Sequence, residues 1–226
     1  MDLEPLYGLR LRTPRLELRW PTPEELAALG RLARAGIHDP DRLPFLVPWT
    51  DPSETFVEDF TAYHEGLRRD WRPEAWNLEC AVLARGELIG IQGMEATRFA
   101  ETRTVTTGSW LGRAFQGRGL GTEMRSAVLS LAFSGLGAVR AHTAAMDHNV
   151  ASQRVSAKFG YLRSGERWPV VRGQPVRELT YTLSRERFSS LEDPVPVEID
   201  GLDGCRACFG ADSAGGAGEP RGQGDG

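Results

Sequence analysis

The stretch QGRGLGTEMRSAVLSLAF, Gln116 to Phe133, places three glycines within five residues and continues directly into an apolar pattern. The apolar residues that recur three and four positions apart are Leu120, Met124, Ala127, Val128 and Leu131. That spacing is typical of a helix with one buried face. The first turn of a helix leaves N–H groups without partners and favours negative charge, and glycine lets the backbone approach a ligand closely. The stretch therefore predicts either an ordinary flexible turn or a backbone cradle for phosphate.

Two well-known phosphate loops do not fit this stretch. A dinucleotide-binding fingerprint, G-x-G-x-x-G, would need glycine where Thr122 stands. A Walker A loop needs lysine after its last glycine, and the stretch contains no lysine. A phosphate cradle here must therefore be of another kind.

The elements around the glycine motif predict a mixed fold. We expect strands over residues 9–20, 78–84, 88–96, 104–111, 139–146, 161–170 and 176–183. We expect helices starting at Thr22 and Ser53, another directly after the glycines, and a short one over residues 149–159. The resulting order is β-α-α-β-β-β-α-β-α-β-β. It indicates an α+β fold, a mostly antiparallel twisted sheet with helices on both faces.

Composition divides the chain into one domain and a tail. With 226 residues, 40% of them hydrophobic, the chain is long enough for one substantial domain, which we assign to residues 1–192. Residues 193–226 hold seven acids and two bases, a net charge of −5, and nine of their 34 residues are glycine. We expect this acidic, glycine-rich tail to be disordered, at least from Ala211 onward.

The same features argue against several classes of protein. A net charge of −4 without an arginine-rich run speaks against nucleic acid as a partner. The N-terminus lacks the apolar core of a signal peptide, and no apolar run is long enough to span a membrane, so we expect a cytoplasmic protein. Cys80 and the lone pair Cys205 and Cys208 make neither a disulfide framework nor a convincing zinc site, so we expect no metal.

Three segments together resemble one enzyme family. Gln116 to Gly121 matches Q/R-x-x-G-x-G/A, the acetyl-coenzyme A signature of the GNAT superfamily of N-acetyltransferases. The segment NVASQRVSAKFGY, Asn149 to Tyr161, resembles a second GNAT segment, with tyrosine in place of the final phenylalanine. The opening TPRLELR, Thr13 to Arg19, resembles the RimJ/RimL-type branch, which includes the ribosomal-protein N-terminal acetyltransferases. The resemblance covers roughly residues 9–185, and it favours the interpretation of the glycine motif as a phosphate cradle over that of an ordinary turn.

The resemblance implies the GNAT fold, whose central strands splay apart after the fourth strand and admit acetyl-CoA as co-substrate. Here the fourth strand is the one expected over residues 104–111, and the pyrophosphate would lie on the N–H groups of residues 116–121. Arg113 and Arg118 are candidate extra cations. The cofactor-binding residues carried over are Trp110, Leu111, Gly112, Gln116, Gly117, Arg118, Gly119, Leu120, Gly121, Thr122 and Asn149.

The implied reaction is direct attack of a primary amine on a thioester, through a tetrahedral intermediate, without a covalent enzyme intermediate. The resemblance implies that a backbone N–H near Leu111 stabilises the oxyanion. Ser152, one helical turn after Asn149, is the candidate that protonates the leaving thiolate, because the tyrosine of many relatives is replaced here by Ser156. A purely structural reading stays open, with Asn149 as an N-cap and Ser152 as a first-turn residue.

The general base is the weakest part of the resemblance, because relatives often carry a glutamate where this chain has Thr106. Glu95, on the preceding strand, is the first substitute. Glu79 and His142 follow, and deprotonation through ordered water is an equal alternative.

Two loops are expected to wall the acceptor site, residues 37–56 with Phe45 and Trp49, and residues 163–178 with Trp168. Their composition does not choose between a peptide or protein N-terminus and a small-molecule amine, nor between monomer and homodimer. Two rival functions remain: a non-catalytic acyl-CoA sensor, and an unrelated nucleotide-binding protein that uses the same loop.

Overall fold

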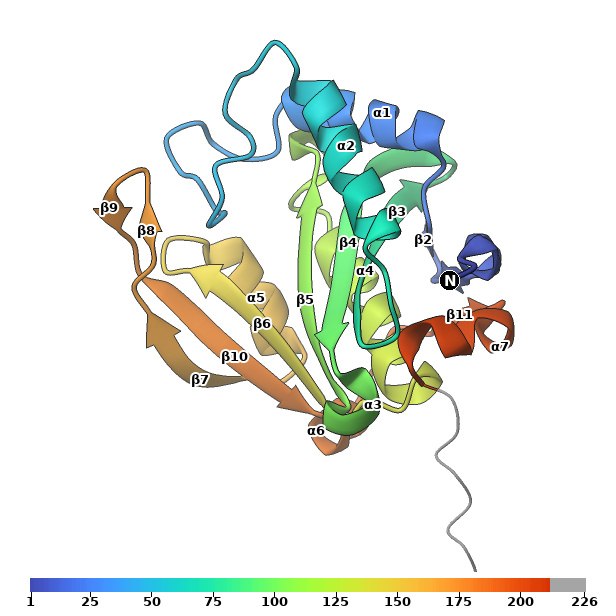
Figure 1. The fold of residues 1–226 in the computed structure, drawn as a ribbon. Helices are drawn as coiled ribbons and strands as arrows, with labels where there is room; N and C mark the ends of the chain where they lie inside the picture. Colours follow the sequence, from blue (N-terminus) through green and yellow to red (C-terminus); the bar gives the residue numbers. More distant parts are fainter. Residues whose placement is uncertain (212–226) are drawn as a thin grey trace, which may run out of the picture.

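The computed structural model describes residues 1–211, and a single large sheet organises them (Figure 1). In these residues nine strands pair in the order β11-β1-β2-β3-β4-β5-β6-β10-β7. Their bounds are β1 (Arg10–Arg12), β2 (Leu16–Arg19), β3 (Ala75–Ala84), β4 (Glu87–Thr97), β5 (Thr104–Leu111), β6 (Arg140–Met146), β7 (Leu162–Arg167), β10 (Glu178–Ser184) and β11 (Glu198–Asp200). A small hairpin of β8 (Val170–Val171) and β9 (Gln174–Pro175) stands between β7 and β10.

Helices cover both faces of the sheet (Figure 1). Their bounds are α1 (Pro23–Arg34), α2 (Phe56–Arg69), α3 (Phe99–Thr102), α4 (Leu120–Ser130), α5 (Val150–Lys158), α6 (Arg185–Ser189) and α7 (Leu202–Cys205). Helices α1 and α2 pack on the face that presents Ala81 and Ile91, whereas α4 packs on the face that presents Cys80. Neighbouring residues of a strand point to opposite faces, so the two helix layers sandwich the sheet.

All pairs of neighbouring strands are antiparallel except β5 and β6, which run parallel. The connection between these two strands contains the glycine motif and α4. This arrangement confirms the predicted fold class, a mostly antiparallel sheet with one crossover and helices on both faces.

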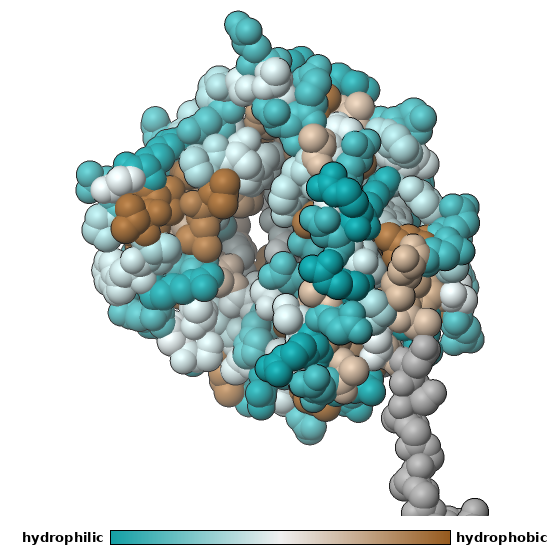
Figure 2. All heavy atoms as spheres, in the orientation of Figure 1, coloured by the Kyte–Doolittle hydropathy of each residue, from teal (hydrophilic) through white to brown (hydrophobic). Residues whose placement is uncertain are grey.

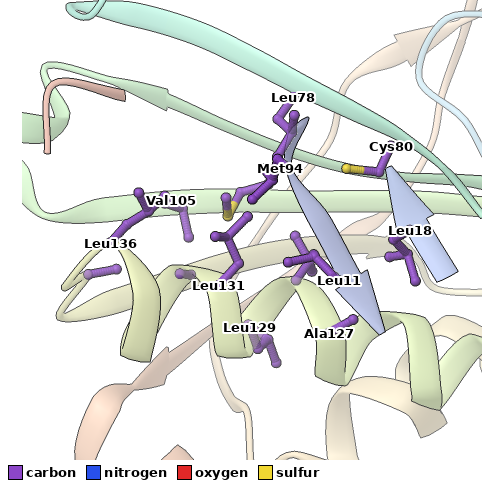
Figure 3. Close-up of a cluster of buried hydrophobic side chains, with 14 of the residues drawn as sticks. Leu11, Leu18, Leu78, Cys80, Met94, Val105, Ala127, Leu129, Leu131 and Leu136 are labelled. Carbon is purple, nitrogen blue, oxygen red and sulfur yellow. The ribbon is translucent and has the colours of Figure 1, made fainter. Parts of the chain in front are cut away.

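The main core lies between the sheet and α4, and Figure 3 shows part of it. Leu78, Met94 and Val105 of β3, β4 and β5 pack with Ala127 of α4 and with Leu131, which directly follows α4. These side chains are at most 1% exposed. The helical spacing of the predicted stripe after the glycine motif therefore reflects the burial of one helix face against three strands.

The N-terminal region differs from its prediction. The single strand expected over residues 9–20 is a hairpin of β1 and β2, because the chain reverses at Thr13 to Arg15 and the Thr13 N–H donates to the Leu16 carbonyl at 2.9 Å. Helix α1 starts as predicted, with Thr22 in a complete capping box with Glu25. Helix α2 starts at Phe56 with Thr55 as its N-cap, two residues after the expected cap at Ser53.

The tail also differs from its prediction, since residues 198–211 belong to the folded domain. Strand β11 pairs with β1 and extends the sheet by one strand. Phe209 is fully buried and packs in an edge-to-face arrangement against both Trp71 and Trp76, with ring centroids at 5.5 and 5.0 Å. The indole N–H groups of these tryptophans donate to the carbonyls of Cys208 and Phe209 at 2.8 and 3.0 Å. The prediction of disorder relied on the high glycine content of the tail and overlooked the apolar anchor Phe209. Residues 212–226 lie outside the described residues.

Across residues 1–211, no helix is long and apolar enough to cross a membrane.

Candidate active site

An opening in the sheet lies between β5 and β6. The two strands pair only from Thr104 to Thr106 on β5 and from Arg140 to His142 on β6, and then diverge. Just past the last pair, the Thr143 hydroxyl donates to the Thr107 carbonyl at 3.0 Å. The rest of β5, up to Leu111, has a partner strand only on its β4 side. The sheet therefore splits along the second half of β5, as the GNAT resemblance implies.

Backbone groups of β5 line this opening. The N–H of Gly112 donates to the Ile89 carbonyl of β4 at 2.9 Å, and the register from Thr106 to Leu111 is regular. N–H groups alternate between the two sides of an antiparallel strand. The N–H groups of Leu111 and Ser109 therefore face away from β4 and into the opening. Two donors are available there to an oxygen atom.

The predicted phosphate cradle lies at the start of α4. Gly117 and Gly119 have φ of 73° and 79°, a left-handed conformation that favours glycine. Within residues 1–211, the N–H groups of residues 117–121 have no hydrogen-bond acceptor. Five consecutive unpaired donors at the N-terminus of an 11-residue helix form a site suited to an anion.

A cation that was not predicted from the sequence lies beside the cradle. The Arg15 side chain donates to the Arg118 carbonyl at 3.1 Å, and its Nη2 would lie 3.5 Å from a Cβ at Gly119. Glu123, buried in the first turn of α4, accepts from the Arg15 N–H at 2.9 Å and from its Nε at 2.6 Å. The Thr13 hydroxyl donates to the same carboxylate at 2.6 Å. The TPR opening of the sequence is thus the part that fixes the N-terminal hairpin to the cradle.

Among the other predicted cofactor residues, the side chains of Gln116 and Trp110 make contacts away from the cofactor side. The Gln116 amide braces the loop by donating to the carbonyls of Ile37 and Leu111 at 2.7 and 2.8 Å. Trp110 points to the α2 face, where its ring lies 6.1 Å from that of Trp49. Only the backbone of these two residues is available on the cofactor side. The remaining predicted members, Gly112, Leu120, Gly121 and Thr122, follow one another along the loop and the first turn of α4.

An aromatic cavity of about 640 Å³ lies on the other face of the sheet and reaches β5 at Gly108, Ser109 and Trp110. The predicted acceptor residues Phe45 and Trp49 line it, together with Phe56, Phe60 and Tyr63 of α2. Figure 2 shows the surface hollowed on this side of the molecule. The cavity and the opening therefore meet at the second half of β5.

Glu79 lies at the floor of this cavity, half-buried. A Cβ at Gly93, its neighbour on β4, would lie 2.7 Å from a Glu79 carboxylate oxygen, and Gly108 follows on β5. Two glycines in register thus leave space for the carboxyl group. Burial, and then the nearby charge of Glu95, raise the pKa of Glu79 to about 8. No hydrogen bond or ion pair holds the Glu79 carboxyl within residues 1–211.

Glu95 and His142 are not in the cavity. Glu95 is exposed in a neighbouring groove of about 780 Å³, where Asn77 donates to it at 3.4 Å. His142 is half-buried on β6, opposite Thr106, and burial lowers its pKa. Of the three candidate bases, the structure places only Glu79 in the aromatic cavity.

Asn149 and Ser152 occupy the first turn of α5. The Asn149 side-chain oxygen accepts from the Ser152 N–H at 3.2 Å, so Asn149 is the N-cap of the helix. Val155, one turn further, would lie 3.9 Å from a Cβ at Gly121. This contact holds α5 against the start of α4, on the cofactor side of the sheet.

Two segments meet above the aromatic cavity. Asp51, in the loop between α1 and α2, forms an ion pair with Arg172 of the β8–β9 hairpin. Trp168 of that arm does not line the cavity; its ring is 59% exposed and lies 6.0 Å from the Arg177 guanidinium. Both predicted acceptor loops thus take part, but only the first one supplies aromatic walls.

The two C-terminal cysteines lie far from these features. Both are buried, and burial raises the pKa of Cys205 to about 12. Among residues 1–211, no three His, Cys, Asp or Glu side chains gather in a group that could hold a metal ion.

A split sheet with unpaired N–H donors on one face and an aromatic cavity with a carboxyl group on the other suits a transferase in which an anionic donor and an acceptor meet at the opening. Comparison with known families agrees, because the acetyltransferase (GNAT) domain matches residues 15–162. The chain belongs to the GNAT acetyltransferase family and is an acetyl-CoA-dependent N-acetyltransferase.

Solved structures share this fold. RimJ from Mycobacterium smegmatis, in complex with a CoA disulfide, is 20% identical, with a TM-score of 0.68 and coverage of 90% of this chain and 95% of RimJ. A RimL ribosomal-protein α-N-acetyltransferase in complex with coenzyme A is 18% identical, with a TM-score of 0.62 and coverage of 76% and 95%. A GCN5-related N-acetyltransferase from Brucella melitensis is 18% identical, with a TM-score of 0.64 and coverage of 81% of both chains.

Proposed function

We propose that this protein transfers an acetyl group from acetyl-CoA to a primary amine by direct attack, with Glu79 as the general base. The observation that carries the proposal is the position of Glu79 at the floor of the aromatic cavity, with a pKa raised to about 8. A base whose pKa lies near the working pH combines a useful basic fraction with a strong drive to accept a proton.

The donor side fits acetyl-CoA. Five unpaired N–H groups at residues 117–121 and the Arg15 guanidinium suit a pyrophosphate. When bound, acetyl-CoA supplies the activated acetyl group as a thioester. The N–H groups of Ser109 and Leu111, which face the opening, are the donors for the oxyanion that forms during attack.

The proton transfers of the reaction give roles to Glu79 and to Ser152. An ammonium must lose its proton before it attacks, and Glu79 receives that proton directly or through one water molecule. The attacking nitrogen must lose a second proton as the tetrahedral intermediate collapses, and Ser152, at the start of α5, relays this proton to the departing thiolate. Asn149 fixes the turn by accepting the Ser152 N–H. A Cβ at Gly108 would meet no atom within 4 Å, so this glycine leaves room for the amine beside the Glu79 carboxyl.

The test is release of free thiol from acetyl-CoA across amines that include short peptides with free N-termini, spermidine and an aminoglycoside. Wild type is compared with Glu79→Gln and with Glu95→Gln as the matched control, since Glu95 lies in the neighbouring groove. We expect Glu79→Gln to lower kcat about 100-fold or more, which is within the range for loss of a general base, and Glu95→Gln to lower it far less. Tight acetyl-CoA binding without turnover on any amine would instead support a sensor.

A further inference from the structure

The aromatic cavity carries information about the acceptor. We infer that the acceptor is the N-terminal α-amine of a polypeptide whose first residue has a large apolar side chain. This inference rests on the proposed function, and it names the substrate class for the same site.

The walls of the cavity are rings gathered around Trp49. The ring centroid of Trp49 lies 5.1 Å from that of Phe45, 6.2 Å from Phe56, 5.9 Å from Phe60 and 6.1 Å from Trp110. These residues come from the α1–α2 loop, α2 and β5, so the wall is built by three separate elements. Such a wall removes an apolar group from water but offers no partners to hydroxyl groups.

Three carboxyl groups line the cavity, and one of them lies at its floor. Among residues 1–211, no lysine or arginine lines the cavity. Asp51 is paired with Arg172, and Asp59 accepts from the Thr55 hydroxyl at 2.7 Å. Buried His64 has a pKa lowered to about 4, mainly by burial, so it is neutral near pH 7. Asp59 is exposed to solvent, so Glu79 is the carboxyl group that an amine meets at the floor of the cavity.

The groups that line the cavity favour some classes of amine over others. A polyamine would bring further ammonium groups, and an aminoglycoside would bring many hydroxyls, into a space with aromatic walls and one carboxyl group at its floor. Polar groups buried without partners cost binding free energy. An amine attached to one apolar body matches the cavity, with the amine at Glu79 and the apolar body among the rings.

The rim of the cavity favours a polypeptide over a small molecule. Val47, beside the mouth, is 66% exposed, and Val170 of the hairpin is 69% exposed. The ion pair between Asp51 and Arg172 keeps their two segments together. Figure 2 shows apolar atoms at the position of the β8–β9 hairpin, next to the hollow. Exposed apolar residues around a pocket are typical of contact with another chain, and a peptide that continues out of the cavity would cover them.

The experiment compares peptides of equal length that differ only in their first residue: Phe, Leu, Met, Ala or Ser. Thiol release from acetyl-CoA gives kcat/KM for each. We expect Phe, Leu and Met peptides to exceed Ser and Ala peptides by about 10- to 100-fold, since an apolar pocket discriminates by roughly that factor for a few methylenes. Spermidine and kanamycin serve as non-peptide acceptors and should be poorer than the apolar peptides.

Two variants locate the source of the preference. Trp49→Ala should reduce the ratio between Leu and Ser peptides toward one. Trp168→Ala, on the arm outside the cavity, should raise KM for all peptides together and leave that ratio unchanged. The wild-type ratios stand on their own if Trp49→Ala fails to fold, as circular dichroism would reveal.

The experiment distinguishes a failure of the inference about the acceptor from a failure of the proposed acetyltransferase function. Equal or better turnover of Ser and Ala peptides, or turnover of spermidine or kanamycin with unreactive peptides, overturns the inference and leaves the acetyltransferase function intact. No thiol release with any peptide or amine, despite acetyl-CoA binding, overturns the proposed function itself.

Discussion

Arg15 donates both its backbone N–H and its Nε to the buried carboxylate of Glu123, at 2.9 and 2.6 Å. The two residues are 108 positions apart in the chain. The contact fixes the β1–β2 turn to the first turn of α4 and leaves the rest of the guanidinium beside Gly119. A carboxylate that stabilises the fold thereby orients a cation at the edge of the phosphate cradle.

We expect Arg15→Ala to weaken coenzyme A binding about 10-fold and to make the Kd less dependent on salt, because a cation near the phosphates is removed. Titration calorimetry at two ionic strengths measures both effects. Arg12→Ala is the matched control, since Arg12 in the same hairpin pairs with Asp200 and Glu17, away from the cradle. An unchanged Kd and salt slope in Arg15→Ala would contradict this role.

Glu123→Gln tests the same contact from its other side. The substitution keeps the shape but removes the charge that accepts three hydrogen bonds, so we expect a loss of about 1–3 kcal/mol in the free energy of unfolding. Because Arg15 then loses its orientation, coenzyme A binding should weaken too. The double variant with Arg15→Ala should bind coenzyme A no more weakly than Arg15→Ala alone, as expected for residues that act as one unit.

The pH dependence of the reaction follows from Glu79. Its pKa of about 8 means that the basic form increases up to that pH. We expect kcat at saturating amine, which reports the enzyme–substrate complex, to rise with pH and to level off above about 8, whereas Glu79→Gln should lose this limb of the profile. A wild-type profile that levels off near pH 5 would show that Glu79 is not the base.

The free energy of unfolding should decrease with rising pH, opposite to the activity. Burial raises the Glu79 pKa from 4.5 to about 8, so between these values the native state binds more protons than the unfolded state. Stability therefore falls as the pH rises through that window. Glutamine resembles the protonated carboxyl, so Glu79→Gln should match wild type in Tm at pH 5 and exceed it at pH 9. A Tm difference that does not change with pH would contradict the raised pKa.

The fold was predictable because its signals are local. The helix after the glycine motif, the capping box at Thr22 and the turn between β3 and β4 each follow from neighbouring residues. The attachment of the N-terminal hairpin to α4 was not, because it depends on Glu123, which is far away in the chain. The packing of Phe209 between Trp71 and Trp76 escaped prediction for the same reason, since one buried ring outweighs a glycine-rich composition.

The candidate site was predictable only along one strand or loop. The cradle at residues 117–121 lies on consecutive residues, and a motif could find it. The choice between Glu79 and Glu95 depends on which carboxyl group faces the cavity, and both side chains point to the same face of the sheet. Strand register decides it: Glu79 is aligned with Gly93 and Gly108, whereas Glu95 is aligned with Asn77 and Thr106. If the pairing of the strands had been known, the alignment of Gly93 and Gly108 with Glu79 would have pointed to Glu79 as the base.

Gly119→Glu tests the phosphate cradle. Gly119 has a φ of 79°, so any side chain there is strained by roughly 1–2 kcal/mol, and a glutamate adds negative charge among the unpaired N–H groups. We expect coenzyme A binding to be lost. Gly86→Glu is the matched control, because Gly86 has a similar φ of 82° in the distant β3–β4 turn. Retained binding in Gly119→Glu would show that the cradle does not hold the phosphates.

Phe209→Ala tests the contribution of the C-terminal segment. The ring is fully buried against Trp71 and Trp76, so its removal should cost about 3–5 kcal/mol in the free energy of unfolding. For a chain of this size that corresponds to a decrease of roughly 6–20 °C in Tm. Asp203→Ala, with a side chain 98% exposed in the same segment, should stay within about 0.5 kcal/mol of wild type. The anchor contacts Trp71, beyond the C-terminal end of α2, whereas the aromatic cavity is lined by the part of α2 from Phe56 to His64. We therefore expect the same kcat at a temperature where both proteins are folded. A Tm unchanged by Phe209→Ala would mean that β11 and α7 are not part of the cooperative unit.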